Sequence, residues 1–274
     1  MTSTQRAVRL ELRGLYKSFG AVQVLHDVDL SIHAGEVTAL VGDNGAGKST
    51  LVKCVSGIYS ADSGEFRFEG RPVTIHNPRD AASLGIEIVY QDLALCDNLD
   101  IVQNMFLGRE RRRGVILDDP DMEQMATKTL AGLAVRTVKS VRQQVASLSG
   151  GQRQTVAIAK AVLWNSKVVI LDEPTAALGV AQTAQVLELV RRLADNGLAV
   201  LLISHNMNDV FAVSDRIAAL YLGRMVAQVK ATDVSHSQIV ELITAGRSGG
   251  LGTPSPVDTN GYDGNGYEAN GVDR

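Results

Sequence analysis

The sequence predicts an α/β fold built on a mainly parallel central sheet, and two stretches of the chain carry this prediction. After residue 149, apolar strands alternate with helices: "KVVILDE" is followed by the helical "GVAQTAQVLELVRRLADNG" and then by the strand "LAVLLISH". Apolar strands that alternate with helices are typical of parallel sheets covered on both faces. Nearer the N-terminus, the short strand "AGEVTALVG" runs through a glycine-rich loop into the helix "KSTLVKCVSGI".

Two further regions accompany this core. Apolar residues alternate at period two in "VRLELRGLYKSF" and "VQVLHDVDLSI", and "GEFRFEG" is a third strand between turn residues. These strands predict an N-terminal antiparallel β subdomain. Residues 77–145 hold three helical stretches, "PRDAASLG", "LDIVQNMFLG" and "DPDMEQMATKTLAGLAV". We expect them to form a helical subdomain inserted into the core.

The chain divides into one large domain, residues 1–245, and a tail, residues 246–274. Eight of the 29 tail residues are glycine, with asparagine, aspartate and serine between them. Such a segment has too little apolar surface to fold, so we expect the tail to be disordered.

Composition and charge exclude several classes of protein. The formal net charge is −3, so no basic excess points to nucleic acid as a partner. Cys54 and Cys96 lie far apart in the sequence, which fits neither a zinc pattern nor a disulfide framework. The first residues lack the apolar stretch of a signal peptide, and runs such as "LAVLLI" are too short to span a bilayer. We therefore expect any membrane contact to come through a partner.

The glycine-rich loop at residues 42–49, "GDNGAGKS", fits the pattern G-x-x-x-x-G-K-[ST]. Glycines let successive backbone amides turn toward phosphate oxygens. The ammonium of Lys48 would lie beside the β- and γ-phosphates, and the Ser49 hydroxyl could bind Mg²⁺. A chance glycine turn is the alternative, but the position between a strand and a helix favours a nucleotide.

Three strand ends supply the other polar groups that such a site needs. In "VVILDEP", four apolar strand residues precede Asp172, which would hold the metal shell, and Glu173, which could poise a water against the γ-phosphate. The alternative is an acidic strand end that caps the next helix. Gln91 and His205 also follow apolar strands. Each is weak alone, but ligands of open α/β sheets bind at the carboxyl ends of strands.

The stretch "LSGGQ", residues 148–152, resembles the signature motif of ABC-type ATPases, a class of P-loop NTPase found as nucleotide-binding subunits of ATP-binding cassette transporters. The resemblance covers about residues 8–245 and includes the family's landmarks in order. It implies that Glu173, His205 and Gln91 are catalytic and that Ser49, Gln91 and Asp172 bind Mg²⁺. It further implies that the Phe19 ring stacks on adenine. The implied ATP site is formed by Phe19, Gly42, Asp43, Asn44, Gly45, Ala46, Gly47, Lys48, Ser49 and Thr50 of one subunit and Ser149, Gly150, Gly151 and Gln152 of the other.

Within this family, "QDLALCDNLDIVQNMFLGRE" is similar to single-cassette ATPases of bacterial sugar importers of the ribose, xylose and fructose group. This implies a homodimer at the cytoplasmic face of the membrane that powers monosaccharide import through transmembrane permease subunits. An extracytoplasmic sugar-binding protein would take part indirectly. Two other functions are weighed: an ABC-type ATPase that acts on nucleic acid or ribosomes, and a binding regulator with weakened ATPase activity.

Three features depart from these patterns or lie outside them. Gly179 stands where the family usually has an aspartate, which leaves the coupling between the two sites open. The basic segment "GRERRRG", residues 108–114, could meet lipid headgroups or a permease loop, or could be a solvated turn, which we favour. Trp164 follows an apolar helix, and we expect it to pack in the core.

Overall fold

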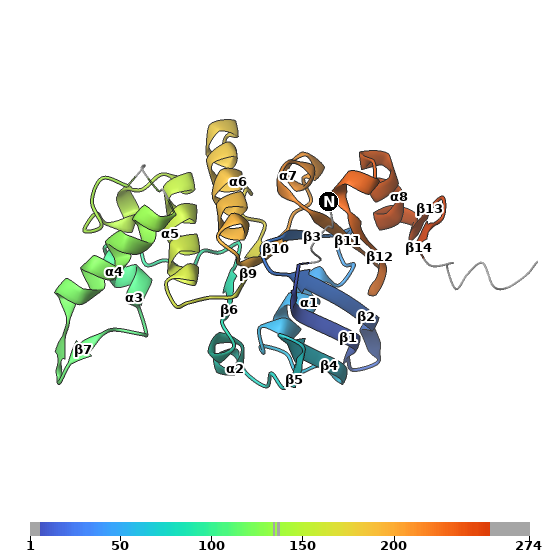
Figure 1. Cartoon of the computed structure of the whole chain (residues 1–274), viewed down its shortest axis with the longest axis horizontal. Coiled ribbons are helices and arrows are strands. Elements are labelled where there is room, and N and C mark those ends of the chain that lie inside the picture. The colour runs from blue at the N-terminus through green and yellow to red at the C-terminus, as the bar shows by residue number, and fades with distance from the viewer. Residues whose placement is uncertain (1–5, 134, 136–137, 253–274) are drawn as a thin grey trace, which may run out of the picture.

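A six-stranded sheet forms the centre of the molecule, in a computed structural model that describes residues 6–133, 135 and 138–252. Neighbouring strands pair in parallel, apart from the antiparallel edge pair β12–β11. This arrangement confirms the predicted α/β class (Figure 1). The strands, in sheet order, are β12 (Arg224–Lys230), β11 (Arg216–Tyr221), β3 (Val37–Val41), β10 (Ala199–Ile203), β9 (Val168–Asp172) and β6 (Ile86–Val89).

The predicted antiparallel β subdomain is a second sheet of four strands. Its order is β2 (Val22–His33), β1 (Val8–Phe19), β4 (Ser63–Phe68) and β5 (Arg71–Val73), and every pair is antiparallel. In β1, leucines at alternate positions are buried while the residues between them are at least partly exposed. This one-sided burial follows from the period-two pattern.

Helices cover the central sheet and extend it sideways. In Figure 1, α3, α4 and α5 gather at one end of the molecule, α6 to α8 stand along one face of the sheet, and α1 lies with the antiparallel sheet on the other. The helices are α1 (Lys48–Val55), α2 (Pro78–Ser83), α3 (Ile101–Phe106), α4 (Asp119–Gly132), α5 (Gly150–Val162), α6 (Val180–Asp195), α7 (Met207–Val213) and α8 (His236–Ala245). Two small hairpins complete the fold: β7 (Arg112–Arg113) with β8 (Ile116–Leu117), and β13 (Arg247–Ser248) with β14 (Leu251–Gly252).

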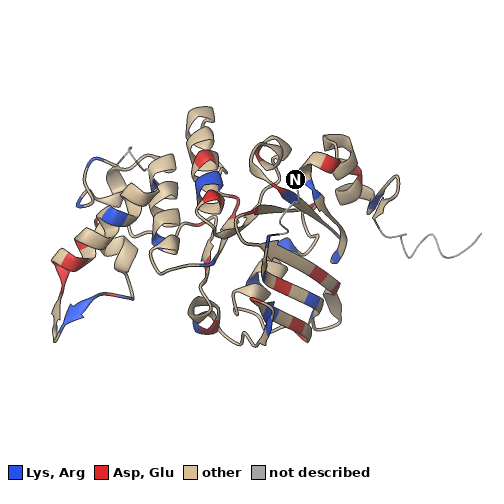
Figure 2. Cartoon of the chain, viewed as in Figure 1, with Lys and Arg blue, Asp and Glu red and all other residues tan. Residues whose placement is uncertain are grey.

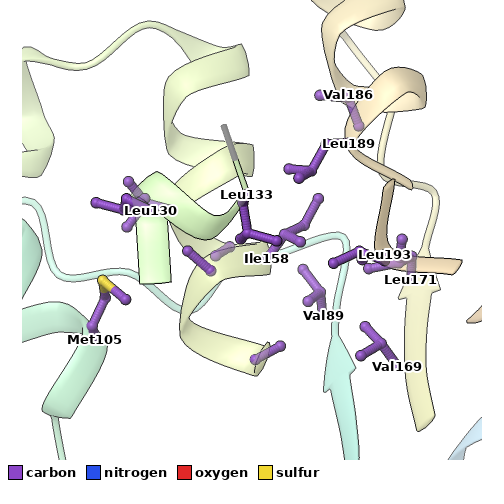
Figure 3. Packing of buried hydrophobic residues seen from close by; sticks show 14 of the residues in the cluster. Val89, Met105, Leu130, Leu133, Ile158, Val169, Leu171, Val186, Leu189 and Leu193 are labelled. Atoms are coloured by element: carbon purple, nitrogen blue, oxygen red, sulfur yellow. The ribbon is translucent and has the colours of Figure 1, made fainter. Parts of the chain in front are cut away.

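The central sheet has a hydrophobic core on each face, which explains why its inner strands are mostly apolar. Along β9, Val169 and Leu171 belong to the cluster under α5 and α6, whereas Val168 and Ile170 face the antiparallel sheet and α1. Figure 3 shows the first cluster, where Ile158 of α5 lies among leucines of α6 and valines of the sheet. Loss of such a fully buried side chain costs about 2–5 kcal/mol. This packing fixes the ends of the strands.

Two predicted boundaries need correction. The expected helical subdomain, residues 77–145, begins too early, because β6 lies within it and pairs with β9 in the central sheet. The tail predicted as disordered, residues 246–274, begins with the β13–β14 hairpin, in which Ser248 is buried against Glu241 of α8. The rest of the tail, residues 253–274, lies outside the described residues.

Trp164 lies near the end of α5 and packs partly buried against the first core cluster, as expected. Its ring meets Phe106 of α3 edge-on, with ring centroids 5.5 Å apart. The basic segment, residues 108–114, forms one strand and the turn of the exposed β7–β8 hairpin between α3 and α4.

Candidate active site

The glycine-rich loop connects β3 to α1 at the middle of the central sheet. Gly42 is buried, and a Cβ there would lie 2.4 Å from the Leu220 carbonyl oxygen, so only glycine fits. Gly47 caps α1 with a φ of 104°, which side chains rarely adopt. The loop is therefore fixed by close packing, and the free amides of the first turn of α1 point out of the helix where an anion binds favourably.

Lys48 extends over the loop that precedes it. Its Nζ donates to the carbonyl oxygens of Gly42 at 2.7 Å and Asp43 at 3.0 Å. Burial lowers the pKa of Lys48, although the carboxylates of Glu173, Asp43 and Asp172 act in the opposite direction. A half-buried ammonium held only by two carbonyls is suited to exchange them for phosphate oxygens.

The acidic strand end lies beside this loop. Asp172 is the last residue of β9, and burial raises the pKa of its carboxyl, with the Glu173 carboxylate adding to the effect. Lys48 and Lys53 lower the same pKa, which places all of these charges within one electrostatic neighbourhood. Negative charge is therefore crowded at this strand end.

Glu173 follows β9 with a φ of 49°, an uncommon conformation for a residue with a side chain. Its backbone amide donates to the Ile203 carbonyl of β10 at 3.0 Å, which holds the turn in place. The carboxylate is 2.9 Å from Nδ1 of His205, which follows β10. Glu173 is only 16% exposed whereas His205 is 74% exposed, so the histidine ring lies at the open side of the pair.

The turn after Glu173 is tied to α7. The Thr175 hydroxyl donates to the buried Asp209 carboxylate at 2.7 Å. This contact fixes the path of the chain between β9 and α6. Asp209 could not be predicted from the sequence, because it lies 34 residues from Thr175 and belongs to no motif.

The structure brings Gln91 to the same edge of the sheet. β6 and β9 are parallel, with Val89 opposite Leu171, so Gln91 lies past the end of its strand as Glu173 does. Gln91 is exposed in the bend that leads toward α3. It therefore lies between the central sheet and the helical end of the molecule.

Phe19, at the end of β1, is 43% exposed, and its ring packs against a neighbouring aromatic side chain. Tyr59 meets its ring edge-on, with centroids 5.1 Å apart and planes at 72°. Asp62 accepts hydrogen bonds from the Ser18 amide at 2.6 Å and from Lys17 Nζ at 2.7 Å. Tyr59 and Asp62 were missed in the sequence, where only the segment "YSADSG" after α1 could have drawn attention to them.

The signature stretch stands apart from the glycine-rich loop. Ser149 caps α5, and its amide and side chain exchange hydrogen bonds with Gln152. In Figure 1, α5 and α1 lie on opposite sides of β9, with the strand ends between them. The structure thus groups residues 42–50, 91, 172, 173 and 205 along the carboxyl ends of the strands but leaves residues 149–152 outside this group.

The signature glycines lie against the start of α6. A Cβ on Gly151 would lie 3.1 Å from Gln182 Cβ, and one on Gly150 would lie 3.1 Å from Leu178. Gln182 also accepts from the Gly179 amide at 3.4 Å. Gly179 caps α6 in an extended conformation, with open space where a side chain would extend. The signature loop and Gly179 are therefore connected within one chain, because both contact Gln182.

The residues expected to bind Mg²⁺ fit that ion. Ser49, Gln91 and Asp172 offer the oxygen atoms that Mg²⁺ prefers, and the ion takes few protein ligands beside water and phosphate oxygens. The Asp172 and Glu173 carboxylates repel each other, and a bound divalent cation would offset this repulsion. Within the described part of the chain, no group of three or more histidine, cysteine or acidic residues could hold a metal by itself. The same residues contain no helix with the length and apolar character needed to cross a bilayer.

The chain is similar to known proteins over most of its length. A family model described as ABC transporter matches residues 25–176. The chain is similar to the xylose/arabinose import ATP-binding protein XylG of Sulfolobus acidocaldarius, with 46% identity over 236 residues, 86% of this chain and 94% of the relative. It is also similar to the fructose import ATP-binding protein FrcA of Rhizobium meliloti, with 46% identity over 245 residues, 87% of this chain and 94% of the relative.

Among solved structures, a nucleotide-free ATP-binding cassette from an ABC transporter superposes with a TM-score of 0.74 at 26% identity, over 81% of this chain and 91% of that one. Sequence, relatives and fold agree on the same assignment: this chain belongs to the ABC transporter family, as an ATP-binding subunit.

Proposed function

We propose that this chain binds and hydrolyses ATP as the motor subunit of a membrane importer for a monosaccharide. The observation that carries the proposal is the separation of two half-sites on one chain. The strand ends hold the phosphate loop and acidic residues, whereas Ser149 and the amides of α5 lie elsewhere. The printed names of the xylose/arabinose and fructose relatives support a sugar as the cargo.

The mechanism follows from the charges of the site. Lys48 and the first amides of α1 bind the phosphates. Ser49, Gln91 and Asp172 would hold Mg²⁺, which would supply positive charge to neutralise the phosphate oxygens. Glu173 accepts a proton from the attacking water, and His205, at the exposed side of the pair, contacts the γ-phosphate and keeps Glu173 oriented.

A second copy completes the site. Ser149 and the Gly150 and Gly151 amides of one subunit, with the α5 dipole behind them, contact the γ-phosphate held by the other. ADP lacks this phosphate, so hydrolysis and phosphate release loosen the pair. Gln91, between the sheet and the helical end, transmits the movement to permease subunits. This assembly places the chain peripherally at the cytoplasmic face of the membrane, with a sugar-binding protein on the opposite side.

The role of Glu173 provides the sharpest test of the hydrolytic step. Glu173→Gln keeps the shape of the side chain but cannot accept the proton, so kcat for ATP hydrolysis should fall about 10²–10⁴-fold. The variant should still bind ATP and accumulate as a closed dimer, measured by light scattering. Glu188→Gln, at an exposed carboxylate paired with Arg192 on α6, is the matched control and should hydrolyse ATP like the wild type. Rapid steady-state hydrolysis by Glu173→Gln would disprove the assignment.

The transport step is tested separately by partners. Purification of the tagged chain from membranes should bring down a hydrophobic permease, and ATP hydrolysis by that complex should rise when a loaded sugar-binding protein is added. ATPase activity that is independent of any membrane fraction, together with co-purifying RNA or ribosomes, would contradict import.

A further inference from the structure

The β7–β8 hairpin extends from the helical end of the molecule and plays no part in the site described above. Arg113 pairs with Ile116 across a turn formed by Gly114 and Val115, and the Asp118 amide closes the base on the Arg111 carbonyl at 2.9 Å. Figure 1 shows the hairpin as the outermost part of this end, between α3 and α4. It is small, and its tip residues belong to none of the hydrophobic clusters formed by the described residues.

The tip carries an unusual concentration of exposed apolar side chains. Val115 is 96% exposed, Ile116 71% and Leu117 50%. Within the described residues, these are the only three consecutive large apolar side chains that are exposed. Exposure of apolar surface to water is unfavourable. Single exposed apolar residues are common on protein surfaces, whereas a run of them at a projecting tip indicates a contact site.

Arginines surround this apolar tip. Arg111 and Arg113 form ion pairs with Asp121 at 2.8 Å and Asp118 at 3.2 Å, toward the start of α4. Arg112 alternates to the other face, beside Leu117. Its charge helps to lower the pKa of Glu110, but within the described residues its side chain forms neither a hydrogen bond nor an ion pair. Figure 2 shows the separation: basic residues colour the outer hairpin, and acidic residues colour the start of α4.

The base of the hairpin is held firmly, so the tip has a defined direction. Arg109 donates to Glu87 at 2.7 Å and lies over the Trp164 ring at 5.4 Å. The Gly108 amide donates to the Glu110 carboxylate at 2.9 Å. These contacts connect the base to the strand β6 and to the end of α5, while they leave the tip in solvent.

We propose that the β7–β8 hairpin binds the surface of an anionic lipid bilayer, with Val115, Ile116 and Leu117 entering the interface and Arg112 contacting phosphate headgroups. Arginine recognises phosphate through a planar fork, and apolar insertion adds to this attraction in surface-bound segments. A protein partner is less well matched, because a stable protein interface needs about 800 Å² from each side. A tip of three apolar side chains, with one arginine outside any ion pair, is sufficient only for a weak, reversible membrane contact.

This inference rests on the proposed position of the chain at a membrane, but it is tested on lipid vesicles without ATP or cargo. Trp164 is the only tryptophan, so Trp164→Phe removes the native tryptophan fluorescence. In that background, Ile116→Trp reports on the hairpin, and Val240→Trp, at a 45% exposed position of α8, is the matched control. Circular dichroism checks that both variants fold.

The emission of Ile116→Trp should shift to the blue with phosphatidylglycerol vesicles and should be quenched by brominated acyl chains, whereas phosphatidylcholine vesicles should have little effect. Adding Arg112→Gln should weaken binding to the anionic vesicles roughly fivefold. An unchanged emission with anionic vesicles, or an equal shift of Val240→Trp, would overturn the proposal. A shift that occurs only with purified permease would assign the hairpin to a protein contact and would also overturn it. A failure of either kind leaves the ATPase proposal standing, since neither measurement involves nucleotide.

Discussion

At the scale of single residues, the site is a compromise between function and stability. Lys48 and Asp172 are both charged where burial disfavours the charge, and each depends on neighbours of opposite sign for compensation. Asp172 has an additional conflict with the Glu173 carboxylate. Such crowding is typical of sites prepared for a polyanion and a divalent cation, and it lowers the stability of the protein without them.

Removal of the Asp172 charge should therefore stabilise the nucleotide-free protein. A raised pKa means that the folded state binds this proton more tightly than the unfolded state, so the wild type loses stability as pH rises through and above about 3.9, the ordinary value for aspartate. Asp172→Asn avoids this loss. Its Tm should exceed that of the wild type by a few degrees at neutral pH, and the two should converge at low pH.

Thermal unfolding between pH 3 and pH 8, without nucleotide or divalent cations, measures this difference. Asp92→Asn, at an exposed position beyond β6, is the control and should follow the wild type. A difference that is constant with pH, or that reverses in sign, would show that the Asp172 charge is not the cause.

Tyr59 should act on the base of the nucleotide and not on its phosphates. It holds Phe19 edge-on, and edge-to-face aromatic pairs are worth about 0.5–1.5 kcal/mol. Tyr59→Leu should weaken ATP binding about two- to tenfold, as measured by calorimetry, and leave the binding of inorganic tripolyphosphate unchanged. Phe19→Leu should show the same selectivity. If Tyr59→Leu weakened the binding of both ligands equally, Tyr59 would support the phosphate-binding loop as a whole and not the stacking of Phe19 on adenine.

At the scale of elements, the start of α6 is the least conventional part of the site. Gly179 caps this helix where the family usually has aspartate, and Gln182 links it to the signature glycines of α5. Glycine is only a few tenths of a kcal/mol worse than aspartate as a cap, so the fold tolerates it. Glycine cannot, however, offer a carboxylate to the other subunit.

Gly179→Asp should restore communication between the two sites without strain. The backbone is extended, with φ −73° and ψ 162°, and the space beyond Cα is open. We expect the Tm to change by no more than about 1 °C and the Hill coefficient for ATP hydrolysis to rise above that of the wild type. Gly179→Asn caps the helix without a charge and should leave the Hill coefficient unchanged. If both variants behaved alike, the charge would have no part in coupling.

The sequence predicts the elements best where one local rule decides them. β10 is apolar throughout, β3 is apolar apart from Thr38, and the glycine-rich loop between β3 and α1 fits one sequence motif. An apolar strand before Gln91 is predicted, but β6 is short and partly exposed, and no local pattern shows that it pairs with β9 in the central sheet. The β13–β14 hairpin depends on Ser248 and Leu251 packing near α8, which a glycine-rich composition conceals.

The residues of the candidate site also divide into those that a local sequence pattern predicts and those that only tertiary packing brings together. The loop, the acidic strand end and His205 are predictable because each lies in a motif or at the end of an apolar strand. Contacts such as Thr175 with Asp209 and Gly151 with Gln182 are not predictable from spacing, because tertiary packing alone brings these residues together. The supporting residues are therefore visible only in the structure.

At the scale of the whole molecule, the account depends on the claim that one chain holds two halves of different sites. The sheet places residues 42–50 and 173 together, while α5 presents residues 149–152 elsewhere. If this is correct, a second copy must supply the signature residues, and the active unit is a head-to-tail dimer. The hairpin at the helical end would then lie outside both sites.

Complementation between two inactive variants tests this claim most directly. Lys48→Ala lacks the phosphate ligand, and Ser149→Arg blocks the signature loop, so each variant alone should have lost ATP hydrolysis. Their mixture should regain activity, because the loop of the Ser149→Arg chain meets an intact signature on the Lys48→Ala chain. Lys48→Ala mixed with the Lys48→Ala/Ser149→Arg double variant is the control and should stay inactive. Recovery in the first mixture alone is the result that we predict. Failure of two folded, dimer-forming variants to regain any hydrolysis would contradict the shared site.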